Sequence, residues 1–526
     1  MAIAIATAAG CTAAATAGDG LGTAGGGTGE TTGAPPPPVP LPALDLGGPS
    51  VPLCEVLDVP VVLDPRRIQQ DPGLAGALAD FLDRVTVETG ATVRVLLAPA
   101  RPVLPLATCP VPLGADADGP VFVWGRAFEP NPAARDVLAC AVDQILALPD
   151  LDEADAAMFS GLLFPILERP GWPADGAVVA AVLVAAGDDE EANMYARPGL
   201  AGEAFVRLAG GGDRRRVLAF AAGAGADELP MFVYTTSAAS RYVETDDLAG
   251  PLDAFAAQVR TACEAHDRPP PPPPPSGCTG IDVLFVIDGS YSMLDEQDAL
   301  RGVDGPPVFA EFTDALLAQL EDVSSIHVGV VSSQPGDTDL HTHTDQPEVP
   351  PSPATDCGLD PGAPFLVAPS PTFAEDFACV AATKANTDEY TAQNAAEALA
   401  KAKSVGFLRD DSVVFVVMLT DEDTQEWLAG TTRTEVRAAL LDAVGGRLDR
   451  LYVHAVLGDP GTFEAPKTVC GGPYGTAVPA RRLTDIVWSL REQGSTSDVC
   501  AGDLAGAFAA ILDDVVRTCE SFVPEG

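Results

Sequence analysis

Short, uninterrupted apolar runs mark the second half of the chain, and polar residues follow each of them. Residues 283–287 and 413–419 are two such runs. Because they are short and rich in branched and aromatic residues, they predict buried parallel strands. Asp288 directly follows the first run, and Thr420 and Asp421 follow the second. Ligands bind at the carboxyl ends of strands in open α/β sheets, so these polar residues are candidates for a binding site.

The same arrangement of runs occurs twice along the chain. Apolar runs of the first half correspond in order to runs of the second half: 57–63 to 281–287, Val178–Val184 to 413–419, and Val217–Ala222 to 451–456. Amphipathic helical stretches lie between the runs. Strands that alternate with helices form a parallel sheet covered on both faces. The sequence therefore predicts two α/β domains of the doubly wound, Rossmann type, each with a mostly parallel central sheet.

Proline-rich segments delimit the two predicted domains. Gly, Thr, Ala and Pro dominate residues 12–51, a composition that cannot bury a core and predicts a disordered linker. Residues 267–277 contain a run of prolines and predict a semi-rigid spacer of about 3.1 Å per residue. The predicted globular domains are residues 52–266 and 278–522.

The charge of the chain restricts its partners. The 526 residues carry a formal net charge of −45, which argues against electrostatic binding of nucleic acid or of anionic lipid headgroups. No apolar run reaches the roughly 18 residues of a membrane-spanning helix. Hydrophobic residues make up 47% of the chain, which is typical of a globular protein.

Cys11 differs from the other ten cysteines in its surroundings. It follows a short apolar stretch that ends in small residues, and residues 1–11 resemble a bacterial lipoprotein signal in which this cysteine is lipidated. The resemblance implies an outer-membrane lipoprotein, facing the periplasm or the cell surface, whose only membrane contact is a lipid anchor. An Ala-rich disordered start is the alternative.

The remaining ten cysteines predict disulfides in an oxidising compartment, because they are widely spaced and form no CxxC pair. The repeat restricts their pairing, since the paired ends of each copy should join its first strand to its last helix. Cys470 and Cys500 have no counterparts in the first copy. The predicted pairs are Cys54–Cys263, Cys278–Cys519, Cys109–Cys140, Cys357–Cys379 and Cys470–Cys500.

The loop after residues 283–287 carries candidate metal ligands. It runs Asp288-Gly289-Ser290-Tyr291-Ser292, so a carboxylate and two hydroxyls stand at alternate positions. Such hard oxygen ligands suit Mg²⁺, Mn²⁺ or Ca²⁺. The loop and the Thr-Asp pair that ends with Asp421 resemble the von Willebrand factor A domain and its metal-ion-dependent adhesion site.

That resemblance covers roughly residues 278–519 and implies a set of ligands. Asp288, Ser290, Ser292 and Asp421 match the family pattern. The family also uses a threonine from a loop between these motifs, for which Thr391 is the best candidate and Thr387 the alternative. The implied function is non-enzymatic: a divalent cation, Mg²⁺ foremost, binds a carboxylate of a protein or cell-surface ligand, in adhesion or envelope assembly.

The first copy lacks most of these ligands. It has Asp64 in the place of Asp288, but Arg66 and Ile68 replace the two serines, and Ala185 and Ala186 stand where the Thr-Asp pair is expected. An arginine beside Asp64 would neutralise the carboxylate in place of a metal ion. The first domain is therefore predicted to be a scaffold or protein-interaction domain.

Other polar residues leave alternatives open. Glu422 and Asp423 could surround the cation or form a solvated acidic loop, and Glu296 and Gln297 suit a helix start. His341 and His343, with Asp345, lie in a proline-rich segment and could hold a transition metal.

Two alternative functions follow from the same residues. One is a metal-dependent hydrolase that uses Asp288, Asp421 and His343, since catalysis needs a poised base and a water-activating ion. The other is a purely structural envelope protein whose cation only stabilises the sheet edge.

Overall fold

The protein is described here by a computed structural model that covers most of residues 53–523. The described residues are 53–100, 121–146, 159, 162–163, 172–174, 176–186, 198–223, 228–245, 247–266, 277–303, 308–320, 323–344, 355–360, 362–383, 388–462, 467–473 and 475–523. Cys11, Cys109, the glycine-rich segment and residues 267–276 of the proline spacer lie outside these ranges. No helix among the described residues is long and apolar enough to cross a membrane.

The first domain alternates strands and helices as the sequence predicts. Its strands are β1 (Val56–Leu63), β2 (Thr92–Pro99), β3 (Val121–Arg126), β4 (Glu129–Pro130), β5 (Val178–Val184), β6 (Val217–Ala222) and β7 (Arg241–Val243). Its helices are α1 (Pro65–Gln70), α2 (Leu74–Thr89), α3 (Pro132–Leu146), α5 (Pro198–Gly210), α6 (Glu228–Thr236) and α7 (Ala249–His266).

The second domain repeats this alternation. Its strands are β8 (Gly280–Ile287), β9 (Ser325–Ser332), β10 (Leu366–Ala368), β11 (Ser412–Leu419), β12 (Leu451–Leu457), β13 (Cys470–Gly472), β14 (Gly475–Ala477) and β15 (Gly494–Asp498). Its helices are α8 (Leu294–Arg301), α9 (Val308–Gln319), α10 (Phe373–Val380), α11 (Thr391–Ala402), α12 (Arg433–Ala443), α13 (Arg481–Trp488) and α14 (Leu504–Ser521). The proline-rich segment after β9 contains the edge strand β10.

Both central sheets have the same topology. The strand order is β4-β3-β2-β1-β5-β6-β7 in the first domain and β10-β9-β8-β11-β12-β15 in the second. In each, the first strand of the domain lies between the second and a later strand, and all pairs are parallel except those that involve β3, β4 or β10. The predicted α/β doubly wound class is therefore confirmed for both domains.

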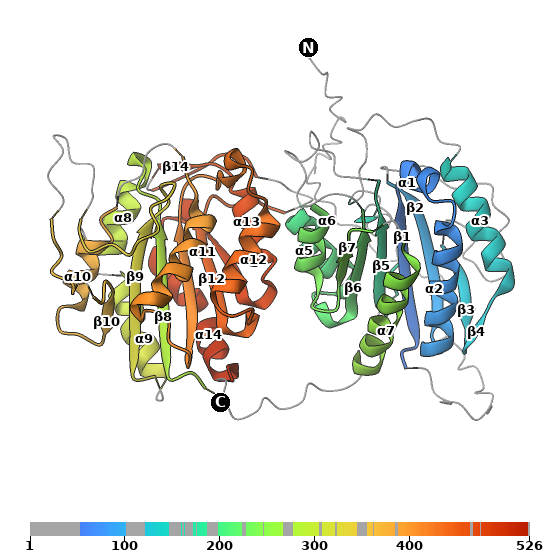
Figure 1. Cartoon of the computed structure of the whole chain (residues 1–526), viewed down its shortest axis with the longest axis horizontal. Coiled ribbons are helices and arrows are strands. Elements are labelled where there is room, and N and C mark those ends of the chain that lie inside the picture. The colour runs from blue at the N-terminus through green and yellow to red at the C-terminus, as the bar shows by residue number, and fades with distance from the viewer. Residues whose placement is uncertain are drawn as a thin grey trace, which may run out of the picture. The chain divides into compact units, whose positions relative to one another are not determined.

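Helices cover both faces of each sheet, as Figure 1 shows. In the second domain, apolar side chains of α8, α9, α10 and α14 pack against one face, and those of α11, α12 and α13 pack against the other. The strands β8, β11 and β12 are buried along their whole length. This explains why they appear in the sequence as unbroken apolar runs and not as an alternating pattern.

Each first strand also contains one buried aspartate, five positions before its last residue. Asp58 in β1 and Asp282 in β8 are both fully buried. Arg94 Nε lies 2.6 Å from Asp58 Oδ1, and Arg409 Nε lies 2.8 Å from Asp282 Oδ1. Because a buried carboxylate needs a paired charge, these arginines stabilise equivalent positions of the two domains.

The disulfides of the described residues coincide with the pairs expected from the repeat. Four are formed: Cys54–Cys263, Cys278–Cys519, Cys357–Cys379 and Cys470–Cys500. Cys140 is also a disulfide cysteine, but its expected partner, Cys109, lies outside the described residues. The first two bridges each join the residues before a first strand to the last helix of the same domain.

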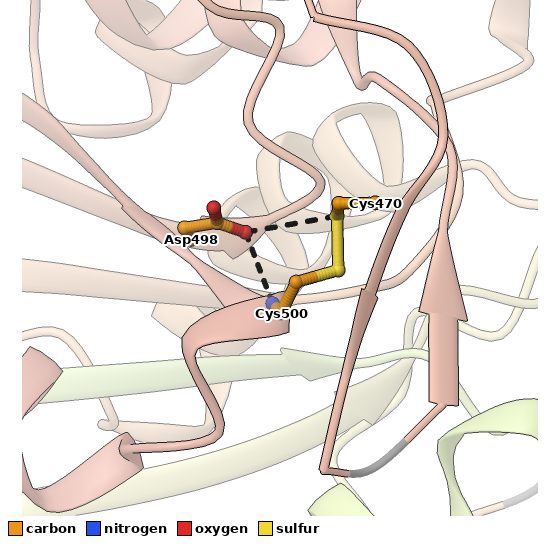
Figure 2. Close-up of side chains that lie close together, drawn as sticks. All are labelled: Cys470, Asp498 and Cys500. Atoms are coloured by element: carbon orange, nitrogen blue, oxygen red, sulfur yellow. Dashed lines mark hydrogen bonds between the residues drawn. A yellow bond between two sulfur atoms is a disulfide. The ribbon is translucent and has the colours of Figure 1, made fainter.

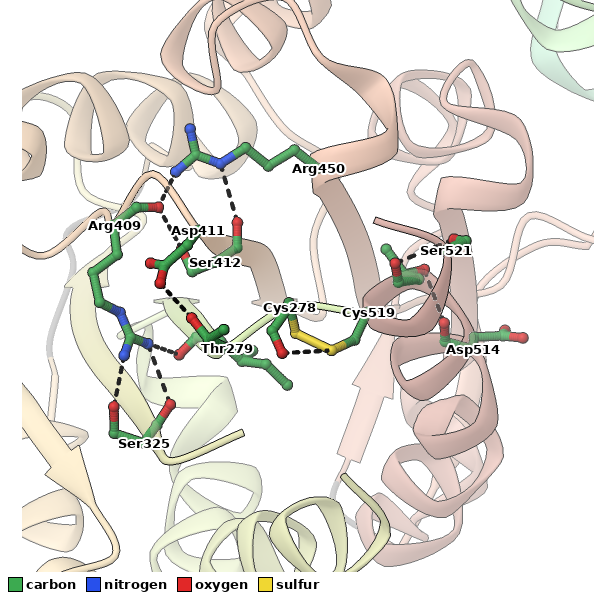
Figure 3. The surroundings of a disulfide bond; sticks show 12 residues. Cys278, Thr279, Ser325, Arg409, Asp411, Ser412, Arg450, Asp514, Cys519 and Ser521 are labelled. Atoms are coloured by element: carbon green, nitrogen blue, oxygen red, sulfur yellow. Dashed lines mark hydrogen bonds between the residues drawn. A yellow bond between two sulfur atoms is a disulfide. The ribbon is translucent and has the colours of Figure 1, made fainter. Parts of the chain in front are cut away.

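The surroundings of Cys278–Cys519 are shown in Figure 3. Arg409 donates to Ser325 Oγ at 2.6 Å, and Arg450 donates through Nε to the carbonyl of Ser412 at 3.1 Å. The starts of β9 and β11 are thus tied together beside the bridge that fixes the start of β8.

Protonation of one buried histidine is expected to destabilise the fold in acid. His454 of β12 is 1% exposed, and its Nδ1 lies 2.8 Å from Ser495 Oγ. Burial lowers the pKa of His454 to about 4. In the unfolded chain this histidine has a pKa near 6.5. Lowering the pH from about 6.5 to about 4 therefore protonates the unfolded chain first and favours unfolding, by about 2–3 kcal/mol. Urea unfolding of the wild type and of His454→Gln at pH 7 and about pH 4.5 tests this: acid should lower the stability of the wild type by about 2–3 kcal/mol relative to the variant, because all other titrating groups contribute equally to both proteins. An equal difference in the variant would assign the acid sensitivity to other groups.

Candidate metal centre

The candidate metal centre lies where two neighbouring strands of the second domain end. β8 and β11 are parallel, with Ile287 opposite Leu419. The backbone N–H of Asp288 donates to the carbonyl of Leu419 at 2.8 Å. Residues that directly follow the two strands therefore meet at one edge of the sheet. The chain leaves β8 towards one face and enters β11 from helix α11 on the other, which is the switch point where doubly wound sheets bind ligands.

Asp288 is held by hydrogen bonds on both carboxylate oxygens. It is fully buried. Its Oδ1 accepts from the backbone N–H of Ser290 at 2.7 Å, and its Oδ2 accepts from the Thr420 hydroxyl at 2.9 Å. Ser290 Oγ and Ser292 Oγ lie 2.9 Å apart. The loop therefore presents one oriented carboxylate beside two neighbouring hydroxyls.

The Asp421 carboxyl belongs to the same group. It is 6% exposed, and its Oδ1 has no hydrogen-bond partner among the described residues. Burial and the charge of Asp288 raise the pKa of Asp421 to about 6, while a hydrogen bond from Ser292 opposes this rise. Burial also raises the pKa of Asp288. Two buried carboxylates thus lie together, and neither forms an ion pair with a cationic side chain within the described part of the chain.

Thr391 is the first residue of α11. It is fully buried, and its hydroxyl has no partner among the described residues. The carboxylate of Glu426 accepts from the backbone N–H groups of Ala392 and Gln393 at 3.1 and 2.9 Å, which fixes this end of α11. Thr387, the alternative, lies outside the described residues.

Two buried glutamates near the site were not identified as site residues. Glu389 is 1% exposed, and burial together with the charge of Asp288 raises its pKa to about 8. Glu296, in the first turn of α8, is 4% exposed, and burial with the charge of Asp421 raises its pKa to about 7. No local pattern identifies Glu389, since its burial depends on the contact between distant loops. Glu296 was interpreted only as a helix start.

Gln297 has a more specific position than that of a helix-start residue. Its amide nitrogen donates to the carbonyl of Asp288 at 3.0 Å, and its amide oxygen accepts from the backbone N–H of Thr383 at 3.3 Å. The side chain is fully buried. It therefore braces the loop that presents Asp288.

The two acids after Asp421 have different surroundings. Burial and the charge of Asp288 raise the pKa of Glu422, which places Glu422 near the centre. Asp423 instead accepts from the backbone N–H groups of Arg482 and Leu483, both at 3.0 Å. Those N–H groups belong to the first turn of α13, so Asp423 caps a helix. The alternative of a solvated acidic loop is therefore wrong for Asp423.

The histidines of the proline-rich segment form no centre of their own in the described residues. His341 Nε2 lies 2.9 Å from Asp337 Oδ2, and this oxygen also accepts from the Ser332 hydroxyl at 2.6 Å. His343 is exposed and contacts Thr342 Oγ1 at 2.7 Å. Asp345 lies outside the described residues.

In the first domain, an arginine occupies the neighbourhood of the equivalent aspartate. The N–H of Asp64 donates to the carbonyl of Val184 at 2.9 Å, as that of Asp288 does to Leu419. Arg66 Nη2 lies 2.8 Å from Asp64 Oδ2, and Arg66 Nε lies 3.2 Å from both oxygens. Ile68 is buried in the core. The forked guanidinium thus compensates the Asp64 charge.

A second cluster of potential ligand atoms is not a metal site. Cys470, Asp498 and Cys500 each offer an atom within 4.8 Å of the others. Figure 2 shows that the two sulfurs are joined in a disulfide and that an Asp498 oxygen faces them. That oxygen accepts from the backbone N–H of Cys500 at 3.0 Å. Disulfide sulfurs lack the thiolate charge that binds metals, so the cluster is structural.

Comparisons with known proteins give only distant similarities. No protein-family model and no curated protein matches the chain. It is similar to the solved structure of proximal thread matrix protein 1 from the mussel byssus, at 12% identity over 89% of this chain and 97% of that one, with a TM-score of 0.38. Another structure of the mussel protein has a zinc-occupied MIDAS motif (13% identity, the same coverage, TM-score 0.37).

A bacterial structure among the matches is a von Willebrand factor type A protein from Catenulispora acidiphila. It shares 14% identity over 40% of this chain and 43% of that one, with a TM-score of 0.24. Proteins with A domains are thus among the structures that this chain resembles. Because all three scores are low, we base the proposed function on the residues of this chain alone.

Proposed function

We propose that residues 278–522 form a von Willebrand factor A-type domain that binds one divalent cation and, through it, a carboxylate of a protein or cell-surface ligand. The observation that carries the proposal is the meeting of Asp288, Ser290, Ser292 and Asp421 at one sheet edge. Their oxygens are the hard ligands that Mg²⁺ prefers, with Ca²⁺ and Mn²⁺ as alternatives.

The buried oxygens of the site fit a cation. Asp421 Oδ1 and Thr391 Oγ1 are buried without a partner among the described residues. Leaving such atoms unpaired costs about 1–3 kcal/mol each, and more for a charged group. A cation held by Asp288, Ser290, Ser292 and Asp421, with Thr391 beside them, would compensate both the charge and the missing contacts.

The chemistry at this site is binding and not catalysis. A bound cation would supply a positive charge with open coordination positions, to which a carboxylate of the partner can add. The chain's own residues orient that cation through the hydrogen bonds of Asp288 and the brace of Gln297. Among the described contacts, none brings His343 to Asp288 or Asp421, so no observation favours the hydrolase alternative.

We propose no cation site in the first domain. Arg66 already compensates Asp64, so a cation would have to displace a guanidinium that makes paired hydrogen bonds. We assign this domain a scaffold or protein-interaction role. We further propose that the protein is an outer-membrane lipoprotein with lipid on Cys11, and that the cation site acts in adhesion or envelope assembly.

Calorimetric titration of the full chain with Mg²⁺, Mn²⁺ and Ca²⁺ tests the proposal. We expect one cation per chain, and a melting temperature that rises with cation concentration and returns with EDTA, because a ligand of the native state stabilises it. Binding of a carboxylate-containing ligand should need the cation. Cation binding without any cation-dependent ligand would support the structural alternative, and no cation binding would exclude the site.

A further inference from the structure

Apolar side chains are exposed around the candidate metal centre. Among the described residues, nine large hydrophobic side chains are exposed, and only two of these are aromatic. Tyr291 is 73% exposed and Trp427 is 52% exposed, with Leu428 beside it at 55%. Tyr291 lies in the loop after β8, and Trp427 and Leu428 lie between β11 and α12. Large exposed apolar side chains near a binding site often mark an interaction surface, so their position at this edge points to a contact surface.

Tyr291 is held outward by its position in the Asp288 loop. It lies between Ser290 and Ser292 and begins a short 3-10 turn, Tyr291–Met293. Met293, at the end of this turn, is fully buried in the core. The turn thus inserts Met293 inward and leaves the tyrosine ring in solvent beside the two serine hydroxyls.

Trp427 and Leu428 lie on a second 3-10 turn, Glu426–Ala429. Glu426 fixes this turn to the start of α11 through its bonds to Ala392 and Gln393. The N–H of Gln425 also donates to the carbonyl of Glu389 at 2.6 Å. Because α11 begins with Thr391, the turn that carries the two exposed side chains is tied to the helix end that carries the threonine of the candidate site.

Val478 is a further exposed apolar residue at the same edge of the sheet. Its N–H donates to the carbonyl of Asp421 at 2.9 Å, and its side chain is 41% exposed. We call Tyr291, Trp427, Leu428 and Val478 the apolar rim. Its members come from three separate loops, and each is joined through backbone or neighbouring residues to one of the proposed ligands.

We propose that the apolar rim binds hydrophobic side chains that flank the partner's carboxylate, so that the partner is a protein segment with one acidic residue between aliphatic or aromatic neighbours. This inference rests on the proposed function. The net charge of −45 disfavours a partner with several acidic residues. Apolar contacts would also exclude water around the carboxylate, which strengthens its attraction to the cation.

The test uses three synthetic peptides with blocked termini. In the first, Asp stands between Phe and Leu; in the second, Asp stands between Ser and Gly; in the third, Asn stands between Phe and Leu. Fluorescence anisotropy measures binding to the full chain with Mg²⁺ or with EDTA. We expect the first peptide to bind at least about tenfold more tightly than the second. The third peptide, and all peptides in EDTA, should not bind at millimolar concentration.

Variants of the apolar rim and of a control position test whether the rim causes the preference for the first peptide. Trp427→Ser with Leu428→Ser should weaken the first peptide about tenfold and so remove most of its preference over the second. Val523→Ser is the control, because Val523 is also exposed, at 42%, but follows α14 at the Cys278 end of the sheet. It should bind all peptides as the wild type does. Calorimetry of Mg²⁺ on each variant accompanies these measurements.

The outcomes separate the rim from the metal centre. Equal binding of the first two peptides in Mg²⁺, or an equal loss for both in the double variant, would overturn the rim and leave the proposed function standing. Loss of Mg²⁺ binding in the double variant would also overturn it, since the residues would then support the cation and not the partner. Failure of the wild type to bind Mg²⁺ would overturn the proposed function itself.

Discussion

Replacing Asp288 with asparagine is expected to abolish cation binding while the fold remains. The substitution keeps the size of the side chain but removes the charge of the best-oriented ligand. Altering groups that only support a ligand costs about 10–100-fold in metal affinity, so loss of a ligand itself should exceed about 100-fold. Calorimetric titration with Mg²⁺ measures the loss, and circular dichroism measures the fold.

The stability of this variant without cation gives a second readout. Asp288 and Asp421 are buried close together, and each charge disfavours the other. Removing one charge should leave the melting temperature in EDTA equal to that of the wild type or higher. A variant that melts earlier in EDTA would show that Asp288 has a structural role that outweighs this repulsion.

Asp64→Asn is the matched control for Asp288→Asn. Asp64 has the equivalent position in the first domain but pairs with Arg66. Its substitution should therefore leave the cation affinity and the stoichiometry of the chain unchanged. A reduced stoichiometry would mean that the first domain also binds a cation, contrary to the role we propose for Arg66.

Removing the Cys278–Cys519 bridge is expected to give the largest loss of stability. The bridge closes a segment of 241 residues, whereas Cys357–Cys379 closes one of 22. The chain-entropy model relates the stabilisation to the length of the closed segment and gives about 5 kcal/mol for the first and about 3 kcal/mol for the second. Paired Cys→Ala variants, unfolded in urea with EDTA present, test the order of these losses. A larger loss for the shorter loop would show that local packing and not chain entropy governs the effect.

The two domains show how one topology accommodates different chemistry at the same edge. Asp64 and Asp288 follow equivalent strands and make the same backbone hydrogen bond to the neighbouring strand. What differs is the residue two positions later, Arg66 or Ser290. The arginine brings its own positive charge to the carboxylate, whereas the serine leaves room and a hydroxyl ligand for a cation.

The sequence by itself determined the class of fold and the main members of the candidate site. Buried parallel strands are apolar along their length, so β8 and β11 were visible as unbroken runs, and the residues that follow them were thereby assigned to one edge. The repeated spacing of cysteines predicted the bridges formed by Cys278 and Cys54. These patterns are local or periodic, so they can be recognised from the sequence alone.

Only the tertiary structure decided the contacts between distant loops. The sequence could not show that Glu389 is buried near Asp288, or that Gln297 bonds to the carbonyl of Asp288, because both depend on how segments about ten to a hundred residues apart meet. The contact of Asp423 with a helix could not be predicted for the same reason, since that helix begins far along the chain at Arg481. Burial and hydrogen-bond partners are properties of the folded chain, so neighbouring acids with the same local pattern, such as Asp421 and Asp423, acquire different functions only when the sheet and its helices are assembled.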